Sequence, residues 1–310
     1  MTSDVLAIDL GKTGCRGSLR VDGGQVGYAQ APGAPGLAHA SGVTAAERAI
    51  RAAIDQIASL PTTFTLSVGA AGAVSAPDAA AALARRLAAV PGTAAVAVTS
   101  DAVTAHAGAL GGSPGVVLAI GTGAVATAVD DAGRFTRVDG WGPQLGDEGS
   151  GGWIGLEGLR AALRAHDGRG PHTILVDKVR EHYGIELDAL PKYLGEQDNP
   201  ALVAASFAPV VAAAVVDDAA AAIMAAAAHA LAGTVLAAIE RSGIHPPVPY
   251  AITGGLTNLG APLLDPLEHR IAHAIDRRDP LGDPIDGAAL LAVDSTTALE
   301  ALVTRISDTY

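Results

Sequence analysis

The chain has 310 residues, which exceeds the usual size of one domain and favours two. It carries 20 Lys and Arg residues against 32 Asp and Glu residues, and the resulting net charge of −12 argues against a general nucleic-acid-binding protein. The single cysteine, Cys15, excludes an intramolecular disulfide and any metal or iron–sulfur site that needs several cysteines.

The first elements predict a set of short paired strands. Val5–Leu10 is an apolar strand that runs into the sharp loop 11–14, and strands at 15–20 and 25–30 follow it. Cys15, at the start of the second of these strands, is expected to be a small buried residue.

Strands then alternate with helices. Apolar residues recur at helical spacing over 44–60, where Thr44 and Glu47 form a plausible capping box. The elements that follow are a strand at 64–68, a glycine-rich turn at 69–72, a helix at 77–90, a strand at 94–99 and a helix at 102–110. This order predicts a mixed sheet covered by helices.

The pattern restarts near residue 115. A buried strand at 116–120, the turn Gly121-Thr122-Gly123 and a strand at 124–129 repeat the strand–loop–strand unit seen near residue 9. Two related halves would place their loops opposite each other across a cleft. The later elements are expected to be helices at 152–164, 173–183, 186–194 and 201–241, a strand at 250–253 and a mostly helical segment at 286–307.

The apolar segment 201–239 is the only stretch that resembles a membrane span. Pro209, Asp217, Asp218 and His229 interrupt it, and most of its residues are alanine, which gains little from lipid. No targeting segment is evident at the start of the sequence. We therefore expect packed helices in a cytoplasmic protein that binds neither membrane nor nucleic acid.

Glycine-bearing turns follow several strands, and two of the strands lead to a carboxylate. The turns are at 9–13, 69–72, 121–123 and 254–255, and the carboxylates are Asp9 and Asp101. Glycine lets a ligand approach the backbone closely. Two carboxylates together with opposed backbone loops are what a magnesium-nucleotide phosphotransferase needs.

The segment 139–150 crowds glycine and acidic residues around Trp141, one of two tryptophans in the chain. It is either a surface loop with a packed tryptophan or a sugar site. A planar apolar face beside carboxylate and amide acceptors suits a sugar, which has both hydroxyl groups and a C–H face.

These motifs resemble the BadF/BadG/BcrA/BcrD ATPase family. The resemblance runs from residue 5 to about residue 258 and rests on Asp-x-Gly-x-Thr, Ser-Asp-Ala, Ala-Ile-Gly-Thr-Gly, Gly-Trp-Gly-Pro-x-Leu-Gly-Asp-Glu-Gly-Ser and Thr-Gly-Gly. The N-acetylglucosamine kinase and glucosamine kinase branch matches best. It implies an α/β protein with two ribonuclease-H-like domains of the actin-like ATPase type, in which mixed sheets flanked by helices surround a central cleft.

The same resemblance implies domain limits. The first domain would span 1–108 together with about 288–310, because the C-terminal helix would pack back on it, and the second would span 109–287. Kinases of this type are often homodimers, which is the assembly that the resemblance implies.

Site residues follow from the resemblance position by position. Asp9 would orient Mg²⁺ through water, and Asp101 would be the general base that takes the proton of a sugar hydroxyl. The expected phosphate-loop residues are Gly11, Lys12, Thr13, Gly121, Thr122 and Gly123. The expected adenosine residues are Gly254 and Gly255, and the expected sugar residues are Gly140, Trp141, Asp147 and Glu148.

Some residues depart from the family pattern. Leu10 and Lys12 stand where glycines are usual, and Lys12 either contacts a phosphate or is solvated. Val125 stands where some relatives have a polar residue that contacts the sugar. His106 is expected to be a packed or solvated helix residue, and Asp217 with Asp218 a solvated helix break rather than a metal site.

The implied function is an ATP-dependent kinase that acts on the 6-hydroxyl of N-acetylglucosamine or glucosamine, with ATP and Mg²⁺. The alternatives are a kinase of another hexose and a non-catalytic sugar or nucleotide sensor on the same fold. An iron–sulfur activator of a dehydratase, which this family contains, and a zinc-containing kinase or repressor of the ROK type both need more cysteines than Cys15.

Overall fold

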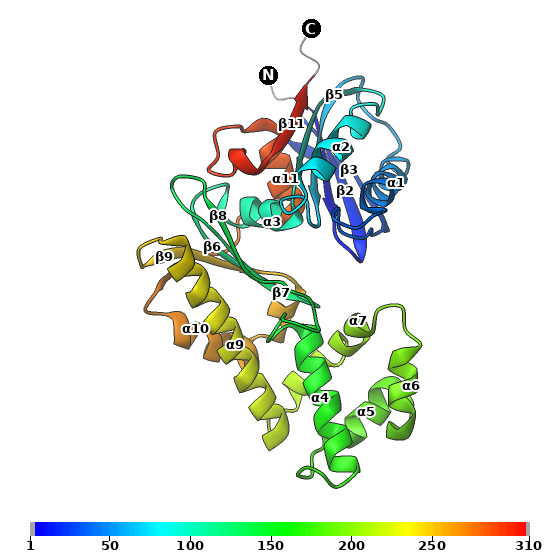
Figure 1. The fold of residues 1–310 in the computed structure, drawn as a ribbon, viewed down its shortest axis with the longest axis vertical. Helices are drawn as coiled ribbons and strands as arrows, with labels where there is room; N and C mark the ends of the chain where they lie inside the picture. The colour runs from blue at the N-terminus through cyan, green and yellow to red at the C-terminus, as the bar shows by residue number, and fades with distance from the viewer. Residues whose placement is uncertain (1–3, 308–310) are drawn as a thin grey trace. The chain divides into compact units, whose positions relative to one another are not determined.

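The computed structural model describes residues 4–307, in two compact units (Figure 1). Unit 1 comprises Met1–Val117, Val129–Phe135 and Arg278–Tyr310, and unit 2 comprises Leu118–Ala128 and Thr136–Arg277.

The sheet of unit 1 has the strand order β11-β5-β4-β1-β2-β3. Its strands are β1 (Val5–Leu10), β2 (Gly14–Val21), β3 (Gly24–Pro32), β4 (Phe64–Ala70), β5 (Thr93–Thr99) and β11 (Thr304–Ser307). The strands β1, β4 and β5 run parallel, whereas β2, β3 and β11 each pair antiparallel with a neighbour. The sheet is therefore mixed, as the sequence predicts.

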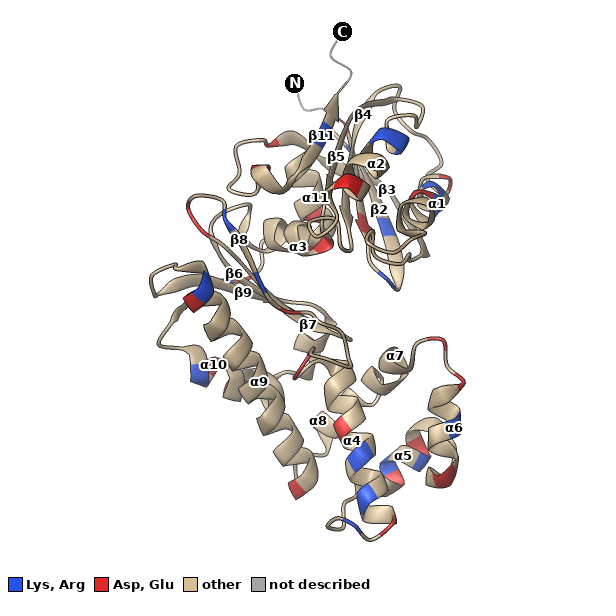
Figure 2. Cartoon of the chain, viewed as in Figure 1, with Lys and Arg blue, Asp and Glu red and all other residues tan. Residues whose placement is uncertain are grey.

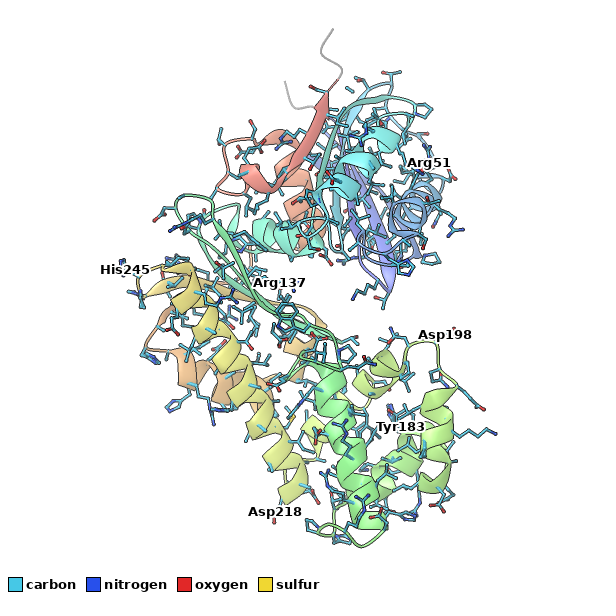
Figure 3. All side chains as sticks on the ribbon, in the orientation of Figure 1. Arg51, Arg137, Tyr183, Asp198, Asp218 and His245 are labelled. Carbon is cyan, nitrogen blue, oxygen red and sulfur yellow. The ribbon has the colours of Figure 1, made fainter. Side chains whose placement is uncertain are left out.

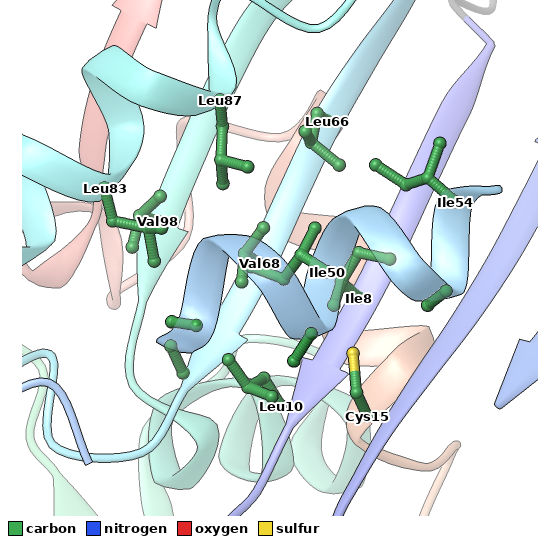
Figure 4. Close-up of a cluster of buried hydrophobic side chains, with 14 of the residues drawn as sticks. Ile8, Leu10, Cys15, Ile50, Ile54, Leu66, Val68, Leu83, Leu87 and Val98 are labelled. Carbon is green, nitrogen blue, oxygen red and sulfur yellow. The ribbon is translucent and has the colours of Figure 1, made fainter. Parts of the chain in front are cut away.

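Helices cover both faces of this sheet. They are α1 (Gly42–Ile54), α2 (Pro77–Leu87), α3 (Asp101–Leu110) and α11 (Pro284–Val293). Figure 4 shows the core on the α1 and α2 side, where Ile50 and Leu83 meet Ile8, Leu66 and other strand residues. On the opposite face α11 packs against α3 and β1. Alternation along β1 thus directs Leu6, Ile8 and Leu10 to one core and Val5 and Ala7 to the α11 side.

The sheet of unit 2 repeats this arrangement with the order β10-β9-β6-β7-β8. Its strands are β6 (Gly115–Ile120), β7 (Ala124–Val129), β8 (Phe135–Asp139), β9 (Val248–Thr253) and β10 (Ile275–Arg277). This order matches β5-β4-β1-β2-β3 of unit 1 strand for strand. In both sheets a tight loop follows the strand that comes first in the sequence, β1 in unit 1 and β6 in unit 2. The predicted class, two α/β units with mixed sheets flanked by helices, is confirmed.

The other elements of unit 2 are helical. They are α4 (Gly151–His166), α5 (Leu175–Tyr183), η1 (Leu187–Ala189), α6 (Leu190–Gly195), α7 (Pro200–Ala205), α8 (Ala208–Ala213), α9 (Asp218–Ser242), η2 (Gly255–Leu259) and α10 (Ala261–Ile271). The expected helix 201–241 is interrupted where Pro209 and the segment 215–218 predicted breaks, and it forms α7, α8 and α9.

The helix α9 is long and apolar enough to cross a membrane by length and composition alone. In the structure it packs against α4, α8 and α10, which is the environment of a core helix. Its charged residues lie at its two ends (Figure 2). Asp217, expected at a solvated break, instead caps the helix by accepting hydrogen bonds from the amides of Ala219 and Ala220.

Three predictions about local structure are wrong. The first helix ends at Ile54 rather than near residue 60, and no capping box forms, because the helix begins at Gly42 and Thr44 lies inside it; Glu47 pairs instead with Arg51 and Arg86. The glycine-rich turn begins later than expected: β4 continues to Ala70, and Gly69 pairs with Asp9 of β1 and Thr99 of β5. A side chain at Gly69 would collide with Thr104 of α3.

The C-terminal segment is the third. Only α11 is an α-helix in the segment expected to be mostly helical, and the chain then passes through η3 (Glu300–Leu302) into β11. The residues of β11 alternate between partly buried and exposed, which is the period of an edge strand. Local patterns do not predict strands β8 and β10 or helix α10.

Two single-residue expectations are confirmed. Cys15 is fully buried, and burial, with a contribution from the charge of Asp9, raises the pKa of its thiol to about 12. His106 is a fully buried residue of α3, and burial lowers its pKa to about 4 although its ring contacts the carbonyl of Ser113. Neither side chain is exposed to a ligand.

Candidate active site

The hairpin between β1 and β2 forms the first glycine loop. The loop closes with a hydrogen bond from the amide of Gly11 to the carbonyl of Gly14, at 2.9 Å. Lys12 and Thr13 at its tip are exposed, and within residues 4–307 their amides donate to no protein acceptor. Such a loop offers backbone N–H donors to an anion.

Asp9 lies near the end of β1, directly opposite Arg16 of β2. The Arg16 guanidinium donates to Asp9 Oδ2 at 2.6 Å and 3.2 Å. Burial raises the pKa of Asp9, and the hydrogen bond and charge of Arg16 only partly offset this. The carboxylate is thus held in a low-dielectric position by one cation.

Asp101 is the first residue of α3. Ser100 caps the helix by accepting a hydrogen bond from the amide of Val103 at 3.2 Å, and the amide of Ala102 donates to Asp101 Oδ1 at 2.9 Å. The pKa of Asp101 is raised to about 6: burial is the main cause and the charge of Asp9 adds to it, while the amide of Ala102 and the charge of Lys12 lower the pKa. Asp9, Lys12 and Asp101 therefore share one electrostatic environment in unit 1.

The second glycine loop, Gly121-Thr122-Gly123, links β6 to β7 in unit 2. Its backbone is held by the start of α4: the amides of Gly151 and Gly152 donate to the carbonyls of Gly121 and Thr122 at 2.8 Å and 3.0 Å. Cβ atoms at these two helix glycines would approach those carbonyls too closely. The glycines of α4 thus permit the close contact that orients the loop.

The acidic loop at 139–150 is built on two aspartates in the left-handed region. Asp139 has φ 62° and Asp147 has φ 58°. The amide of Asp147 donates to Asp139 Oδ1 at 2.9 Å. A Cβ atom on Gly123 would lie 2.7 Å from Asp147 Oδ2, so the structure brings the second glycine loop and Asp147 together.

The other expected sugar residues differ in exposure. Trp141 is 63% exposed, and the Arg137 guanidinium lies 4.7 Å from its ring centroid (Figure 3 labels Arg137). Glu148 is exposed, whereas Asp147 is buried. Gly140 has a left-handed backbone and packs against Val125. Trp141 therefore offers an accessible apolar surface, and Asp147 offers a positioned acceptor in the same loop.

A cavity of about 310 Å³ opens next to this loop. The polar residues of its wall are Gln144, Asp147, Ser150, Arg160, Asp198 and Asn199. Apolar groups come from Trp153, Leu156, Leu194, Pro200 and Ala204. A concave cavity that combines apolar walls with several polar groups is typical of small-molecule sites.

The two consecutive glycines after β9 have different surroundings. Gly254 has φ 98°, and a Cβ atom there would collide with the backbone of Ile120 at the end of β6. Gly255 has open space around it and lines a cavity of about 590 Å³ with Gly121, Thr122 and η2. The structure thus brings Gly255 and the second glycine loop to one cavity.

The roles of some residues in these sites are not predicted by the sequence. Arg16 is opposite Asp9 only through strand register, which no local pattern reveals. Asp139 was part of the noted acidic segment, and its role in holding Asp147 depends on a left-handed backbone. Asn199 comes from a distant helix start.

Repeated sheets of this strand order, each with a glycine loop after its first strand, define the chain as an α/β protein of the actin-like ATPase fold. A model of the BadF/BadG/BcrA/BcrD ATPase family matches residues 6–292, and the chain belongs to that family.

Several relatives carry more specific names. The chain is 42% identical over 78 residues to an N-acetylmuramic acid/N-acetylglucosamine kinase from Clostridium acetobutylicum, a match that covers 25% of this chain and 26% of the relative. It is 32% identical over 211 residues to an N-acetyl-D-glucosamine kinase from Dictyostelium discoideum, a match that covers 64% of this chain and 65% of the relative. These matches span less than two thirds of either relative. The structure of a candidate N-acetylglucosamine kinase from Chromobacterium violaceum superposes with a TM-score of 0.73 at 29% identity, over 94% of this chain and 99% of that one.

Proposed function

We propose that the chain is an ATP-dependent amino-sugar kinase that transfers the γ-phosphoryl group to the 6-hydroxyl of N-acetylglucosamine or glucosamine. The observation that carries this proposal is Asp101, a carboxylate with a pKa of about 6 at the start of a helix, in the same unit as Asp9 and the first glycine loop. The names of the relatives point to the same reaction.

Asp101 is suited to act as the general base. With a pKa of about 6 it is ionised at pH 7, yet it is more basic than an ordinary aspartate. In the proposed reaction it accepts the proton of the sugar hydroxyl as the oxygen attacks phosphorus. The remaining residues position substrates and balance charge, which is the larger part of catalysis in phosphoryl transfer.

The carboxylates fit a magnesium ion that is carried by a nucleotide. No cluster of three or more His, Cys, Asp or Glu side chains is present within residues 4–307, so the donor set is too small for a cation bound by protein alone. Mg²⁺ is normally held by one or two carboxylates together with substrate phosphates and water, and Asp9 is the residue we assign to it. Bound there, the ion would neutralise charge on the phosphates.

The remaining residues are proposed to bind the phosphates, the adenosine and the sugar. The loops at Gly11, Lys12 and Thr13 and at Gly121, Thr122 and Gly123 hold phosphates. The adenosine lies in the 590 Å³ cavity beside Gly255, and Gly254 supports that site from behind. The sugar is held by Gly140, Trp141, Asp147 and Glu148. Because ATP is the donor, we propose that the reaction takes place in the cytoplasm. From the family resemblance we propose that the protein is a homodimer.

A coupled assay of ADP release tests the proposal. The purified chain with Mg²⁺ and ATP is supplied with N-acetylglucosamine, glucosamine, N-acetylmannosamine or glucose. We expect turnover with at least one of the two named amino sugars to exceed turnover with glucose. A preference for glucose would assign a different hexose kinase, and ATP turnover that no sugar increases would favour a sensor.

Asp139 is expected to act through Asp147. Replacing Asp139 with Ala removes the acceptor for the Asp147 amide and a residue that tolerates φ 62°. We expect KM for the sugar to rise about tenfold, as for one lost hydrogen bond to a charged group, with a smaller effect on KM for ATP. Asp139→Asn keeps the acceptor and the backbone preference, so it should stay close to the wild type. Equal sugar KM values in all three proteins would contradict this role.

The 310 Å³ cavity is expected to take the acyl group of the sugar. The apolar side chains of its wall suit the methyl group of an acyl substituent. Leu156→Trp narrows the cavity, and we expect kcat/KM to fall about tenfold for N-acetylglucosamine and less for glucosamine. Leu163→Trp, a half-buried position on the same helix outside the cavity, is the matched control. Equal losses on both sugars would show that the cavity holds no substituent.

A further inference from the structure

Arg16 already holds the carboxylate that we assign to magnesium. Two of its nitrogens donate to the same oxygen, Asp9 Oδ2, at 2.6 Å and 3.2 Å. The contact is built into the fold, because Asp9 and Arg16 are directly opposed in the β1–β2 ladder and so project from the same face of the sheet. Side-chain exposures of 37% for Arg16 and 15% for Asp9 leave the arginine the more accessible partner.

A second acceptor for Arg16 is close and rigid. Arg16 Nη1 lies 3.5 Å from Asp283 Oδ2. Asp283 caps α11: its Oδ1 accepts hydrogen bonds from the amides of Ile285 and Asp286, at 2.8 Å and 3.0 Å. The capping box is completed by Asp286, which accepts from the Asp283 amide. One oxygen of Asp283 therefore belongs to the helix, and the other faces Arg16.

We propose that Arg16 is a resident counter-cation of Asp9 that moves to Asp283 when the magnesium–nucleotide complex binds, so that a divalent cation reaches Asp9 only together with the nucleotide. This inference rests on the nucleotide site of the proposed function. Arg16 is a positioning residue, since it acts through Asp9.

The geometry makes this transfer a small movement. A full charge-assisted contact has a length of about 2.8 Å, so the guanidinium must approach Asp283 by only about 0.7 Å. A cation without nucleotide would have to displace Arg16 in return for a single carboxylate. A cation with nucleotide brings phosphate oxygens as further ligands, and the exchange then becomes favourable.

Binding of Mn²⁺ to the full chain, followed by the electron paramagnetic resonance signal of the free ion, tests the proposal without any sugar. In the wild type we expect weak binding of Mn²⁺ alone and tight binding with ADP. Arg16→Met keeps much of the side-chain length and removes the charge. It should strengthen binding of Mn²⁺ alone about tenfold, the effect expected for one partly buried ion pair, and so reduce the dependence on ADP.

Two variants make the result specific. Arg20→Met removes a neighbouring arginine on the same face of β2, which pairs with Asp286 and also ties β2 to α11. It is the matched control and should bind Mn²⁺ like the wild type. Asp283→Asn retains a good helix cap but weakens the second acceptor of Arg16. It should leave binding of Mn²⁺ alone weak and lower binding of Mn²⁺ with ADP several-fold.

The results of these Mn²⁺ binding measurements distinguish failure of the inference from failure of the proposed function. If Arg16→Met and Arg20→Met bind Mn²⁺ alone equally, Arg16 is only a structural link and the inference is wrong, whereas the kinase proposal stands. If the wild type binds Mn²⁺ no better with ADP than without it, the nucleotide site itself is refuted, and the inference falls with it.

Discussion

Replacing Asp101 with Asn is expected to lower kcat at least a hundredfold while binding of ATP and sugar stays near the wild-type level. The amide has nearly the same shape and can still accept the hydrogen bond from the Ala102 amide, so α3 should begin as before. It cannot take a proton, and a general base contributes about 10²–10⁴ to the rate. Single-turnover kinetics and calorimetry of each substrate separate the two effects.

The matched control is Asp78→Asn, which changes an exposed aspartate in the first turn of α2. Both variants lose one negative charge near a helix N-terminus, where carboxylates are stabilising by about 0.3–1 kcal/mol. Asp78→Asn should lose this small contribution, whereas Asp101→Asn also removes a charge that burial disfavours and should not be less stable than Asp78→Asn; only Asp101→Asn should lose turnover. Near wild-type kcat in Asp101→Asn would remove this residue from the mechanism.

The pH dependence offers an independent check of Asp101. Burial raises its pKa to about 6, and the ionised form is the base. The value of kcat/KM for the sugar should be constant above this pKa and fall tenfold per pH unit below it, with a midpoint near pH 6, because kcat/KM reports the free enzyme. An ordinary aspartate would place this midpoint about two units lower. The residual rate of Asp101→Asn should show no such acid limb.

Gly254→Ala is expected to be the most destabilising of the substitutions considered. The backbone of Gly254, with φ 98° and ψ 162°, lies in a region essentially restricted to glycine, and a Cβ atom would collide with Ile120. Strain and collision together should lower the free energy of unfolding by about 3 kcal/mol or more, and lower Tm by roughly 6–12 °C. Differential scanning calorimetry measures this change.

The adjacent glycine is the control. Gly255 has no positive φ, and no heavy atom lies within 4 Å of the point that an alanine Cβ would occupy, so Gly255→Ala should change stability by less than about 0.5 kcal/mol. Because Gly254 contacts the end of β6, which leads into Gly121, the first variant should also raise KM for ATP. Equal Tm values for the two alanine variants would contradict the packing at Gly254.

Local patterns in the sequence were sufficient for much of the fold. Apolar runs followed by glycine identified β1, β4 and β6, and proline with polar residues identified the breaks before α8 and α9. The helical expectation for the C-terminal segment failed because β11 is short and its pairing with β5 is a long-range contact. The short strands β8 and β10 escaped for the same reason, since a strand of few residues has little periodicity.

The glycine and cysteine content of the chain determined two properties directly. One cysteine excludes a multi-cysteine cluster whatever the fold, and glycine after a buried strand marks a tight turn because its backbone conformation is local. The loops around Gly11 and Gly121 could be identified for this reason, whereas the role of Asp101 followed from the family resemblance of the Ser-Asp-Ala motif.

Only the tertiary structure determined which of these residues contact each other and how their charges interact. Arg16 meets Asp9 through strand register, Asp283 approaches Arg16 from a helix more than 260 residues away along the chain, and the pKa of Asp101 depends on burial. Charge interactions and desolvation depend on distance in space. A sequence specifies which charges exist, and the packed chain determines which of them meet.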